Sequence, residues 1–389
     1  MFSLRRVPPI YSKVRWSALG RAAWAHVGET AVATARSRLS SVYPGRHITL
    51  TDSGTSALLL ALRLTRPTDG RRPWVALPAF ACPDIGTAAI GAGYRIVLYD
   101  VAPDTLEPDL DSLRRCLRAG ASHVVAVHLF GRVVNVSRLA EQAAPFGALV
   151  IEDAAQHAGG TLHGVRGGAL AAWSILSFGR GKGLNAGGGG ALLRPANEPV
   201  DAPELSASGT GASLTLLAKA GVAELLSAPS VYALPQAIPA LQLGETVYHA
   251  PDEPRAISIA SASLLIEALD KEAPALTARQ KNEQRYAEAL ARVGHVTLEV
   301  PPVGSISGAL RFPVRMRPDM AGSLLAFGVA RSYPRILSQY PEIAAHCDLL
   351  PHSLSGAAEL ANLLHTLPTH GRVRPHDIEH LITGVTKAR

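Results

Sequence analysis

The stretch Ser174-Ile-Leu-Ser-Phe-Gly-Arg-Gly-Lys-Gly-Leu-Asn-Ala-Gly-Gly-Gly-Gly190 decides the fold, because it places one lysine, Lys182, among glycines directly after a strand-like apolar run. Glycine accepts backbone conformations that other residues avoid, and it lets the main chain approach a ligand closely. An amine enclosed by such a loop can lose its hydration, which lowers its pKa and makes it a nucleophile. Taken alone, the stretch leaves a second interpretation open, a surface lysine in a glycine-rich hairpin.

The composition is that of a globular protein with a sizeable core. The chain has 389 residues, of which 47% are hydrophobic and 18% charged, enough for a large domain and a smaller one or for two similar domains. The net charge of +7 suits anionic ligands such as phosphates. Scattered arginines and only 5% aromatic residues disfavour nucleic-acid binding.

The cysteines and the N-terminal residues indicate the cellular compartment of the protein. The three cysteines, Cys82, Cys116 and Cys347, are far apart and lack metal-site spacing, which predicts a reducing, cytoplasmic compartment and no metal. No apolar segment follows the first arginines, so we expect no secretory signal, and no uncharged apolar run reaches transmembrane length. The most apolar candidate, residues 212–226, contains Lys219 and Glu224 and predicts an amphipathic helix.

Residues 47–193 alternate between strand-like and helix-like segments. The alternation is typical of an α/β domain with helices layered on a sheet. The continuous apolar run from His123 to Phe130 predicts a strand buried on both faces, as in a parallel sheet. The expected strands are residues 47–50, 74–77, 95–101, 123–130 and 148–153, and the expected helices are residues 56–64, 83–91, 109–118 and 136–144.

The second half of the chain lacks this regular alternation of strand-like and helix-like segments. Residues 195–250, the connector, are rich in proline, serine and glycine and predict a connection or insertion. A long helical pattern then covers residues 257–293, and it is followed by mixed strand-like and helix-like segments up to residue 385. We therefore expect a large domain over residues 1–250, with an N-terminal arm and the connector, and a small α+β domain over residues 251–389.

Two fragments upstream of Lys182 could belong to the same site. The turn Ser53-Gly-Thr-Ser56 follows a strand and opens a helix, so its free N–H groups and the helix dipole predict an anion site, with a plain helix cap as the alternative. Asp153 ends a buried strand, and ligands of open α/β sheets bind beyond such ends. Pyridoxal phosphate needs fixed donors for its phosphate, a carboxylate for its ring nitrogen and an amine for its aldehyde.

Four motifs in chain order make the sequence recognisable. They are Ser53-Gly-Thr-Ser-Ala-Leu58, Val127-His-Leu-Phe-Gly131, Val150-Ile-Glu-Asp-Ala-Ala-Gln156, and Ser177-Phe-x-x-x-Lys182 followed by glycines. Together they resemble the DegT/DnrJ/StrS family of pyridoxal-phosphate-dependent sugar aminotransferases. The resemblance covers most of residues 45–195 and, more loosely, 255–286 and 346–382. It implies the fold type I architecture, with a three-layer large domain around a mainly parallel sheet and a smaller α+β C-terminal domain.

The resemblance also implies roles for individual residues. Lys182 would hold pyridoxal 5'-phosphate as an internal aldimine and then move the substrate's proton, Asp153 would pair with the pyridinium nitrogen, and Gln156 would lie near the ring's phenolic oxygen. The cofactor's phosphate would be bound by Gly54, Thr55 and Ser177. The family forms homodimers with shared active sites, and the implied reaction passes an amino group from an amino acid such as L-glutamate to a keto sugar, usually nucleotide-linked.

Three positions depart from the family's pattern. Cys82 stands where relatives often carry an aromatic residue that stacks on the cofactor ring, and Phe80 is no obvious substitute. Gly188 stands where relatives carry an acid in the glycine-rich loop. The segment Glu253-Pro-Arg255 replaces an Asn-aromatic-Arg segment whose asparagine reaches the other subunit's phosphate. The cofactor chemistry is untouched by these changes, but the acceptor substrate stays open.

Other functions remain alternatives at this stage. The same scaffold supports pyridoxal-phosphate-dependent dehydration, but family dehydratases replace the lysine with histidine, so Lys182 favours transamination. A non-sugar carbonyl or a lipid-linked acceptor is possible as the amine acceptor. A non-catalytic binding or regulatory protein is the alternative from another class, and the presence of Lys182, Asp153, Gln156 and Ser177 argues against it.

Overall fold

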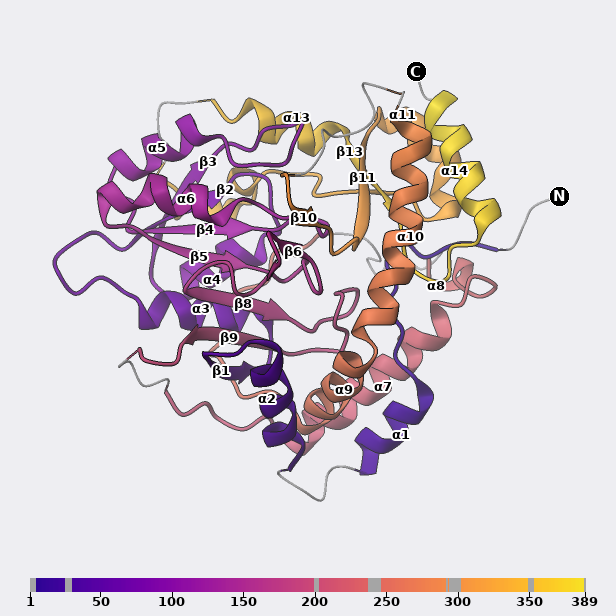
Figure 1. The fold of residues 1–389 in the computed structure, drawn as a ribbon, viewed down its shortest axis with the longest axis horizontal. Helices are drawn as coiled ribbons and strands as arrows, with labels where there is room; N and C mark the ends of the chain where they lie inside the picture. The colour runs from indigo at the N-terminus through magenta and orange to yellow at the C-terminus, as the bar shows by residue number, and fades with distance from the viewer. Residues whose placement is uncertain are drawn as a thin grey trace.

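A seven-stranded sheet forms the centre of the larger part of the molecule in the computed structural model, which describes residues 5–24, 30–198, 203–236, 246–291, 293, 302–348 and 353–387 (Figure 1). Its order is β1-β9-β8-β5-β4-β2-β3. Only β9 is antiparallel to its neighbours, so the predicted mainly parallel sheet is confirmed. The strands are β1 (Arg46–Thr51), β2 (Trp74–Pro78), β3 (Arg95–Tyr99), β4 (His123–Val127), β5 (Leu149–Asp153), β8 (Trp173–Ser177) and β9 (Gly190–Pro195).

Helices cover both faces of this sheet, because alternate strand residues point to opposite sides. In β4, Val124 and Ala126 join the core under α5 and α6, whereas Val125 and Val127 join the core under α3 and α4. The helices are α3 (Gly54–Leu64), α4 (Asp84–Gly91), α5 (Leu110–Arg118) and α6 (Val136–Ala143), each within a few residues of its prediction. The short strands β6 (Thr161–Leu162), β7 (Val165–Arg166) and β10 (Ser305–Ile306) form a separate ribbon.

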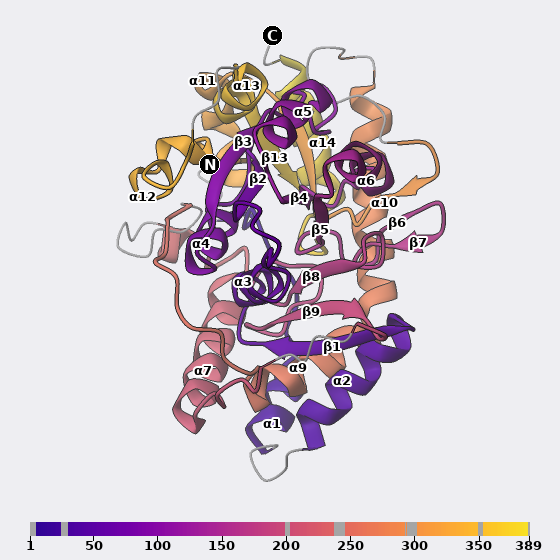
Figure 2. The same ribbon diagram turned by 90° about the vertical axis from the view of Figure 1, so that its left-hand side faces the viewer.

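A third layer of helices lies at the β1 end of the sheet (Figure 2). Their apolar residues share one core with Ile48, Leu50 and Leu193 of β1 and β9. The helices are α1 (Trp16–Trp24), α2 (Thr30–Val42), α7 (Thr210–Leu226) and α9 (Ile259–Asp270). The connector therefore contains a long helix, α7, at the position of the predicted amphipathic helix, and then a short one, α8 (Ala233–Gln236).

The C-terminal part has its own core of Tyr286, Val314, Leu367 and Leu381, as expected for a second α+β unit. Its sheet has the order β11-β13-β12. The elements are α10 (Glu272–Leu290), β11 (Arg311–Arg315), α11 (Pro318–Ala321), β12 (Ala330–Arg331), α12 (Pro341–Ala344), α13 (Ser355–Leu363), β13 (Leu364–Pro368) and α14 (Pro375–Lys387). The domain boundary near residue 250 stays a prediction.

The helical pattern predicted over residues 257–293 forms two helices, which separate at Lys271. The buried leucines of α9, Leu264 and Leu265, belong to the core at the β1 end of the large sheet, whereas Tyr286 and Leu290 of α10 belong to the C-terminal core. The break lets consecutive helices join different cores. The strand expected at residues 296–300 lies outside the described residues.

Candidate active site

The carboxyl ends of the parallel strands bring the candidate residues to one edge of the sheet. Because β1, β5 and β8 point the same way, the segments that follow them emerge side by side. Ligands of such sheets bind at this edge. All six predicted site residues lie there or in the loop that follows β8: Gly54, Thr55, Asp153, Gln156, Ser177 and Lys182.

The N-terminus of α3 lies against Ser177 and forms a small cradle. Ser53 caps the helix, since its hydroxyl accepts a hydrogen bond from the N–H of Ser56 at 3.0 Å. A Cβ added to Gly54 would lie 2.8 Å from the Cβ of Ser177, so any larger residue would force the helix and Ser177 apart. The first N–H groups of a helix lack intrahelical partners and carry the positive end of its dipole. The Gly54 and Thr55 amides and the Ser177 hydroxyl thus form a donor set for a small anion.

Asp153 is a buried carboxylate with spare hydrogen-bonding capacity. Its Oδ1 accepts from the N–H of Ala155 at 2.9 Å, and no other described residue donates to it. Burial raises its pKa, while the hydrogen bond from the Ala155 N–H and the positive charge of Lys182 lower it. A buried carboxylate is costly unless a cation or donor satisfies it. The site therefore favours a cationic N–H group beside Asp153.

The preceding residue, Glu152, has a different task. Its carboxylate is fully buried and pairs with Nε2 of His128 at 3.0 Å. It also accepts N–H groups from Gly168, Leu170 and Ala171. Both carboxylate oxygens of Glu152 therefore have two hydrogen-bond donors each, and Glu152 serves the structure of the site, not its chemistry.

The Gln156 side chain is hydrogen-bonded to two residues that lie far apart in the sequence. Its Oε1 accepts from the N–H of Phe130 at 3.1 Å, and its Nε2 donates to the Tyr333 hydroxyl at 2.8 Å. Phe130 has φ 59, in the left-handed region where non-glycine residues are strained. The Tyr333 ring packs edge-on against Phe80 and faces Phe130, with centroid distances of 5.5 and 6.0 Å.

Tyr333 was not predicted from the sequence. It is 177 positions from Gln156 and comes from the segment after β12, so no local motif marks it. Burial raises the pKa of the Tyr333 phenol strongly, and the hydroxyl stays protonated at neutral pH. The hydroxyl is therefore a fixed polar group at the edge of the site.

The loop that carries Lys182 is fastened by residues 5–15, the N-terminal strap. The strap's Ile10 packs on Gly181, whose φ of 81 requires glycine. The Ser12 hydroxyl donates to the Lys182 carbonyl at 2.7 Å, and Nδ2 of Asn185 donates to the Ser12 carbonyl at 2.8 Å. Lys182 itself is half-buried. The main chain of the lysine is thus held from outside the sheet.

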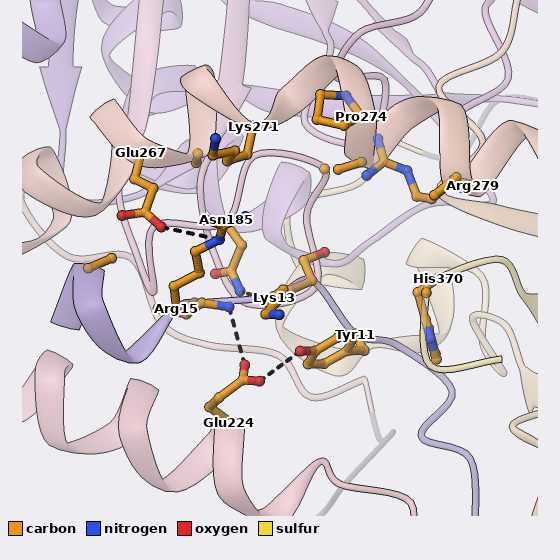
Figure 3. A pocket seen from close by; sticks show the side chains of 18 of the residues that line it. Tyr11, Lys13, Arg15, Asn185, Glu224, Glu267, Lys271, Pro274, Arg279 and His370 are labelled. Carbon is orange, nitrogen blue, oxygen red and sulfur yellow. Dashed lines mark hydrogen bonds and ion pairs between the residues drawn. The ribbon is translucent and has the colours of Figure 1, made fainter.

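A cavity of about 550 Å³ adjoins the strap and contains Gly183 and Asn185 in its wall (Figure 3). Tyr11 and Glu224 point toward each other there, and Glu224 of α7 accepts from the Tyr11 hydroxyl at 2.7 Å and from the Val14 N–H at 3.2 Å. Arg372 donates to the same carboxylate at 2.7 Å and lies 3.8 Å from the Tyr11 ring centroid. Glu224 therefore connects the strap, the inserted helix and the C-terminal part.

The positions that depart from the family's pattern also have definite surroundings. Burial and the negative charge of Asp84 raise the pKa of the Cys82 thiol to about 12, so the thiol stays protonated at neutral pH. Phe80 is fully buried in the core. A Cβ at Gly188 would lie 3.1 Å from Cδ1 of Leu216 on α7. Helix α7 thus occupies the space next to Gly188.

These residues could hold pyridoxal phosphate. The cradle that a Cβ at Gly54 would fill suits its phosphate, and the free oxygen of Asp153 suits its protonated ring nitrogen. The Lys182 amine, whose charge reaches Asp153, suits its aldehyde. Within the described ranges, no group of three or more His, Cys, Asp and Glu side chains is placed to hold a metal ion, and no helix is long and apolar enough to cross a membrane.

Sequence comparison links the chain to one enzyme family. A model of the DegT/DnrJ/EryC1/StrS aminotransferase family matches residues 17–211. The L-glutamine:2-deoxy-scyllo-inosose aminotransferase of Streptomyces kanamyceticus is 32% identical over 147 residues, 38% of this chain and 34% of that protein. The 3-amino-5-hydroxybenzoate synthase of Amycolatopsis mediterranei is 29% identical over 181 residues, 46% of each chain. The chain thus spans less than half the length of these curated relatives.

Structural comparison extends the likeness to the whole fold. AtS13 from Actinomadura melliaura superposes with a TM-score of 0.77 at 23% identity and covers 100% of both chains. A DegT DnrJ EryC1 StrS aminotransferase from Brucella abortus superposes with a TM-score of 0.74 at 22% identity over 95% of each chain. The C-terminal part and the connector, which the sequence match does not reach, therefore share this architecture.

Proposed function

Because the chain belongs to the DegT/DnrJ/EryC1/StrS aminotransferase family, we propose that it is a pyridoxal-phosphate-dependent aminotransferase with Lys182 as its catalytic residue. The observation that carries the proposal is the meeting of three groups at one sheet edge: the Gly54–Ser177 cradle, the under-satisfied Asp153 carboxylate and the Lys182 amine. Each of these groups suits a different part of the same cofactor, and their combination at one sheet edge favours a pyridoxal phosphate site over three unrelated structural features.

Each residue then has a defined task. When bound, pyridoxal phosphate supplies an electron sink and an aldehyde that carries the amino group. Lys182 would hold the cofactor through that aldehyde and would carry the proton of the substrate's Cα. Asp153 would keep the ring nitrogen protonated, and Gln156, fixed by Phe130 and Tyr333, would orient the ring's phenolic oxygen. Gly54, Thr55 and Ser177 would hold the phosphate.

For the substrates, we propose an amino acid, L-glutamate first, as the donor and a nucleotide-linked keto sugar as the acceptor. Relatives are named for 2-deoxy-scyllo-inosose and for a dTDP-linked dehydro sugar, which supports a cyclic, hydroxylated ketone. We also propose a homodimer with shared active sites. The three cysteines are free thiols, which supports a reducing compartment such as the cytoplasm.

The Lys182→Ala variant tests the proposal. Wild-type protein should be yellow and lose its visible absorbance on addition of L-glutamate, and Lys182→Ala should lack this absorbance while it keeps its fold by circular dichroism. A colourless wild-type protein that cannot bind added pyridoxal phosphate would refute the proposal. For the acceptor, protein loaded with the amine form should be screened with keto compounds. Return of the visible absorbance only with non-sugar carbonyls would refute the sugar assignment.

A further inference from the structure

The cavity of about 550 Å³ beside the N-terminal strap, the strap cavity, is lined by more positive than negative side chains (Figure 3). Its five cations are Lys13, Arg15, Lys271, Arg279 and Arg372. An excess of positive charge around a concave site attracts anions. None of the six residues predicted for the active site lines this cavity. The strap cavity is therefore a candidate binding site of its own.

The two carboxylates in the wall of the strap cavity are already paired. Glu224 accepts a hydrogen bond from Arg372 at 2.7 Å. Glu267 forms ion pairs with Arg15, at 3.7 Å, and with Arg21. Three cations of the cavity remain, and within the described ranges no carboxylate forms an ion pair with any of them: Lys13, Lys271 and Arg279.

Arg279 is the buried member of these three cations. It lies on α10 with 5% of its surface exposed, and its Nε donates to the Gly308 carbonyl at 3.3 Å. A guanidinium has five N–H groups, yet no other acceptor among the described residues bonds to this one, and its Nη2 is buried without a partner. Figure 3 shows the guanidinium turned toward the interior of the cavity. A bound anion would offset the cost of burying such a charge.

Two carboxylates act on Arg279 from a distance, but both have other partners. Glu272 pairs with Arg166, and Glu283 accepts from the Ser307 hydroxyl at 2.8 Å. Burial lowers the pKa of the Arg279 guanidinium, and the charges of Glu272 and Glu283 oppose that decrease. Arginine stays charged at neutral pH, so the cavity keeps an inner positive charge whose N–H groups are available.

The three cations come from different parts of the chain. Lys13 belongs to the strap, and Lys271 lies at the break between α9 and α10; both side chains are exposed. A Cβ at Gly183, the residue after Lys182, would lie 3.4 Å from Nη2 of Arg279, so the guanidinium packs against the Lys182 loop. A ligand that contacts all three cations would therefore join the strap, the helix break and the Lys182 loop.

We propose that the strap cavity binds a small organic molecule through its phosphate monoester group, which Arg279 holds together with Lys13 and Lys271. A phosphate monoester carries nearly two negative charges at neutral pH, so it balances three cations better than one carboxylate does. Guanidinium groups bind phosphate oxygens through paired, charge-assisted hydrogen bonds. The volume of the cavity is that of an organic ligand, whose apolar part would contact Leu264 of α9 and Pro274 of α10.

Calorimetric titration with phenyl phosphate at constant ionic strength tests the inference. Wild-type protein should bind this probe with a Kd at or below about 1 mM, and it should bind benzoate, the matched carboxylate, more weakly. Arg279→Gln should weaken phenyl phosphate binding about 10- to 100-fold, and the exposed Lys13→Gln and Lys271→Gln about 2- to 5-fold each. Lys281→Gln removes an exposed charge of α10 that does not line the cavity, and it should leave the affinity unchanged.

Two further measurements locate the bound probe. The cradle at α3 also suits a phosphate, so the titration is repeated with Gly54→Ala, which should bind phenyl phosphate as tightly as wild-type protein does. Trypsin cleaves after Lys13 and Arg15, so the probe should slow cleavage at these strap residues in wild-type protein and in Gly54→Ala, but not in Arg279→Gln. Neither measurement requires bound pyridoxal phosphate, so failure of the proposed function leaves this test intact.

Four results would overturn the inference. They are an unchanged affinity in Arg279→Gln, an equal loss in Lys281→Gln, a loss confined to Gly54→Ala, which would place the phosphate in the cradle, and benzoate binding as tight as that of phenyl phosphate. If Arg279→Gln does not fold, Lys13→Gln and Lys271→Gln decide by the same comparison with Lys281→Gln.

Discussion

Replacement of Gly54 by alanine tests the phosphate cradle most directly. The added Cβ would lie 2.8 Å from the Cβ of Ser177, whereas ordinary contacts begin at 3.4 Å, so the two must separate by the difference, 0.6 Å. A hydrogen bond of about 2.9 Å stretched by that amount reaches the limit of about 3.5 Å beyond which it is lost. The variant should therefore lose about one charge-assisted hydrogen bond to the phosphate, which weakens cofactor binding about 10- to 100-fold.

The effect on stability should be much smaller than the effect on binding. Alanine in a helix is favoured over glycine by about 0.5–1 kcal/mol, which offsets part of the about 1–3 kcal/mol that overpacking costs. Gly211→Ala on α7 is the control, because nothing lies within 4 Å of its added Cβ. Titration of apoprotein with pyridoxal phosphate, followed by absorbance, measures the affinity. If Gly54→Ala binds the cofactor as tightly as Gly211→Ala, the phosphate does not sit between α3 and Ser177.

Three further changes test other parts of the structure. Asp153→Ala should weaken pyridoxal phosphate binding and abolish the donor half-reaction with L-glutamate; retained activity would remove its assigned role. Glu224→Gln should lower the free energy of unfolding in urea by about 1–3 kcal/mol, because its carboxylate is 10% exposed and binds Arg372, whereas loss of the exposed pair at Asp270 in Asp270→Asn should cost under about 1 kcal/mol. Equal losses would show that Glu224 does not fasten the strap. Burial lowers the pKa of His123 from 6.5 to about 4, so between these values the unfolded chain binds a proton that the folded chain does not. The free energy of unfolding therefore decreases as the pH is lowered from 6.5 to about 4. His123→Asn should reduce that slope by about 1.4 kcal/mol per pH unit, and an unchanged slope would place the acid sensitivity elsewhere.

The sheet and half of the site were predictable because their signals are local. A strand buried on both faces is a continuous apolar run, as in residues 123–127 of β4, although the run continues to Phe130, three residues past the end of the strand. Parallel strands end at one edge, so Gly54 and Asp153 could be placed together without knowledge of the strand order. The position of Lys182 follows from the same rule, since its loop begins at the end of β8.

The rest depends on contacts between distant segments. Tyr333 reaches Gln156 from the segment after β12, 177 positions away, and no local pattern marks that contact. Glu224 looked like a charge that interrupts an apolar helix, yet it is the residue that holds the N-terminal strap. The helix break at Lys271 likewise follows from the presence of two cores, which the uninterrupted helical pattern does not reveal.

Helix α7 of the connector packs beside the position in the glycine-rich loop that departs from the family's pattern. Leu216 of α7 fills the space beside Gly188, so an acid at that position would meet an apolar side chain. Glu224 of the same helix accepts a hydrogen bond from Tyr11 of the strap, and Ser12 of the strap donates to the Lys182 carbonyl. Changes in the glycine-rich loop and in the connector are therefore coupled by direct contact.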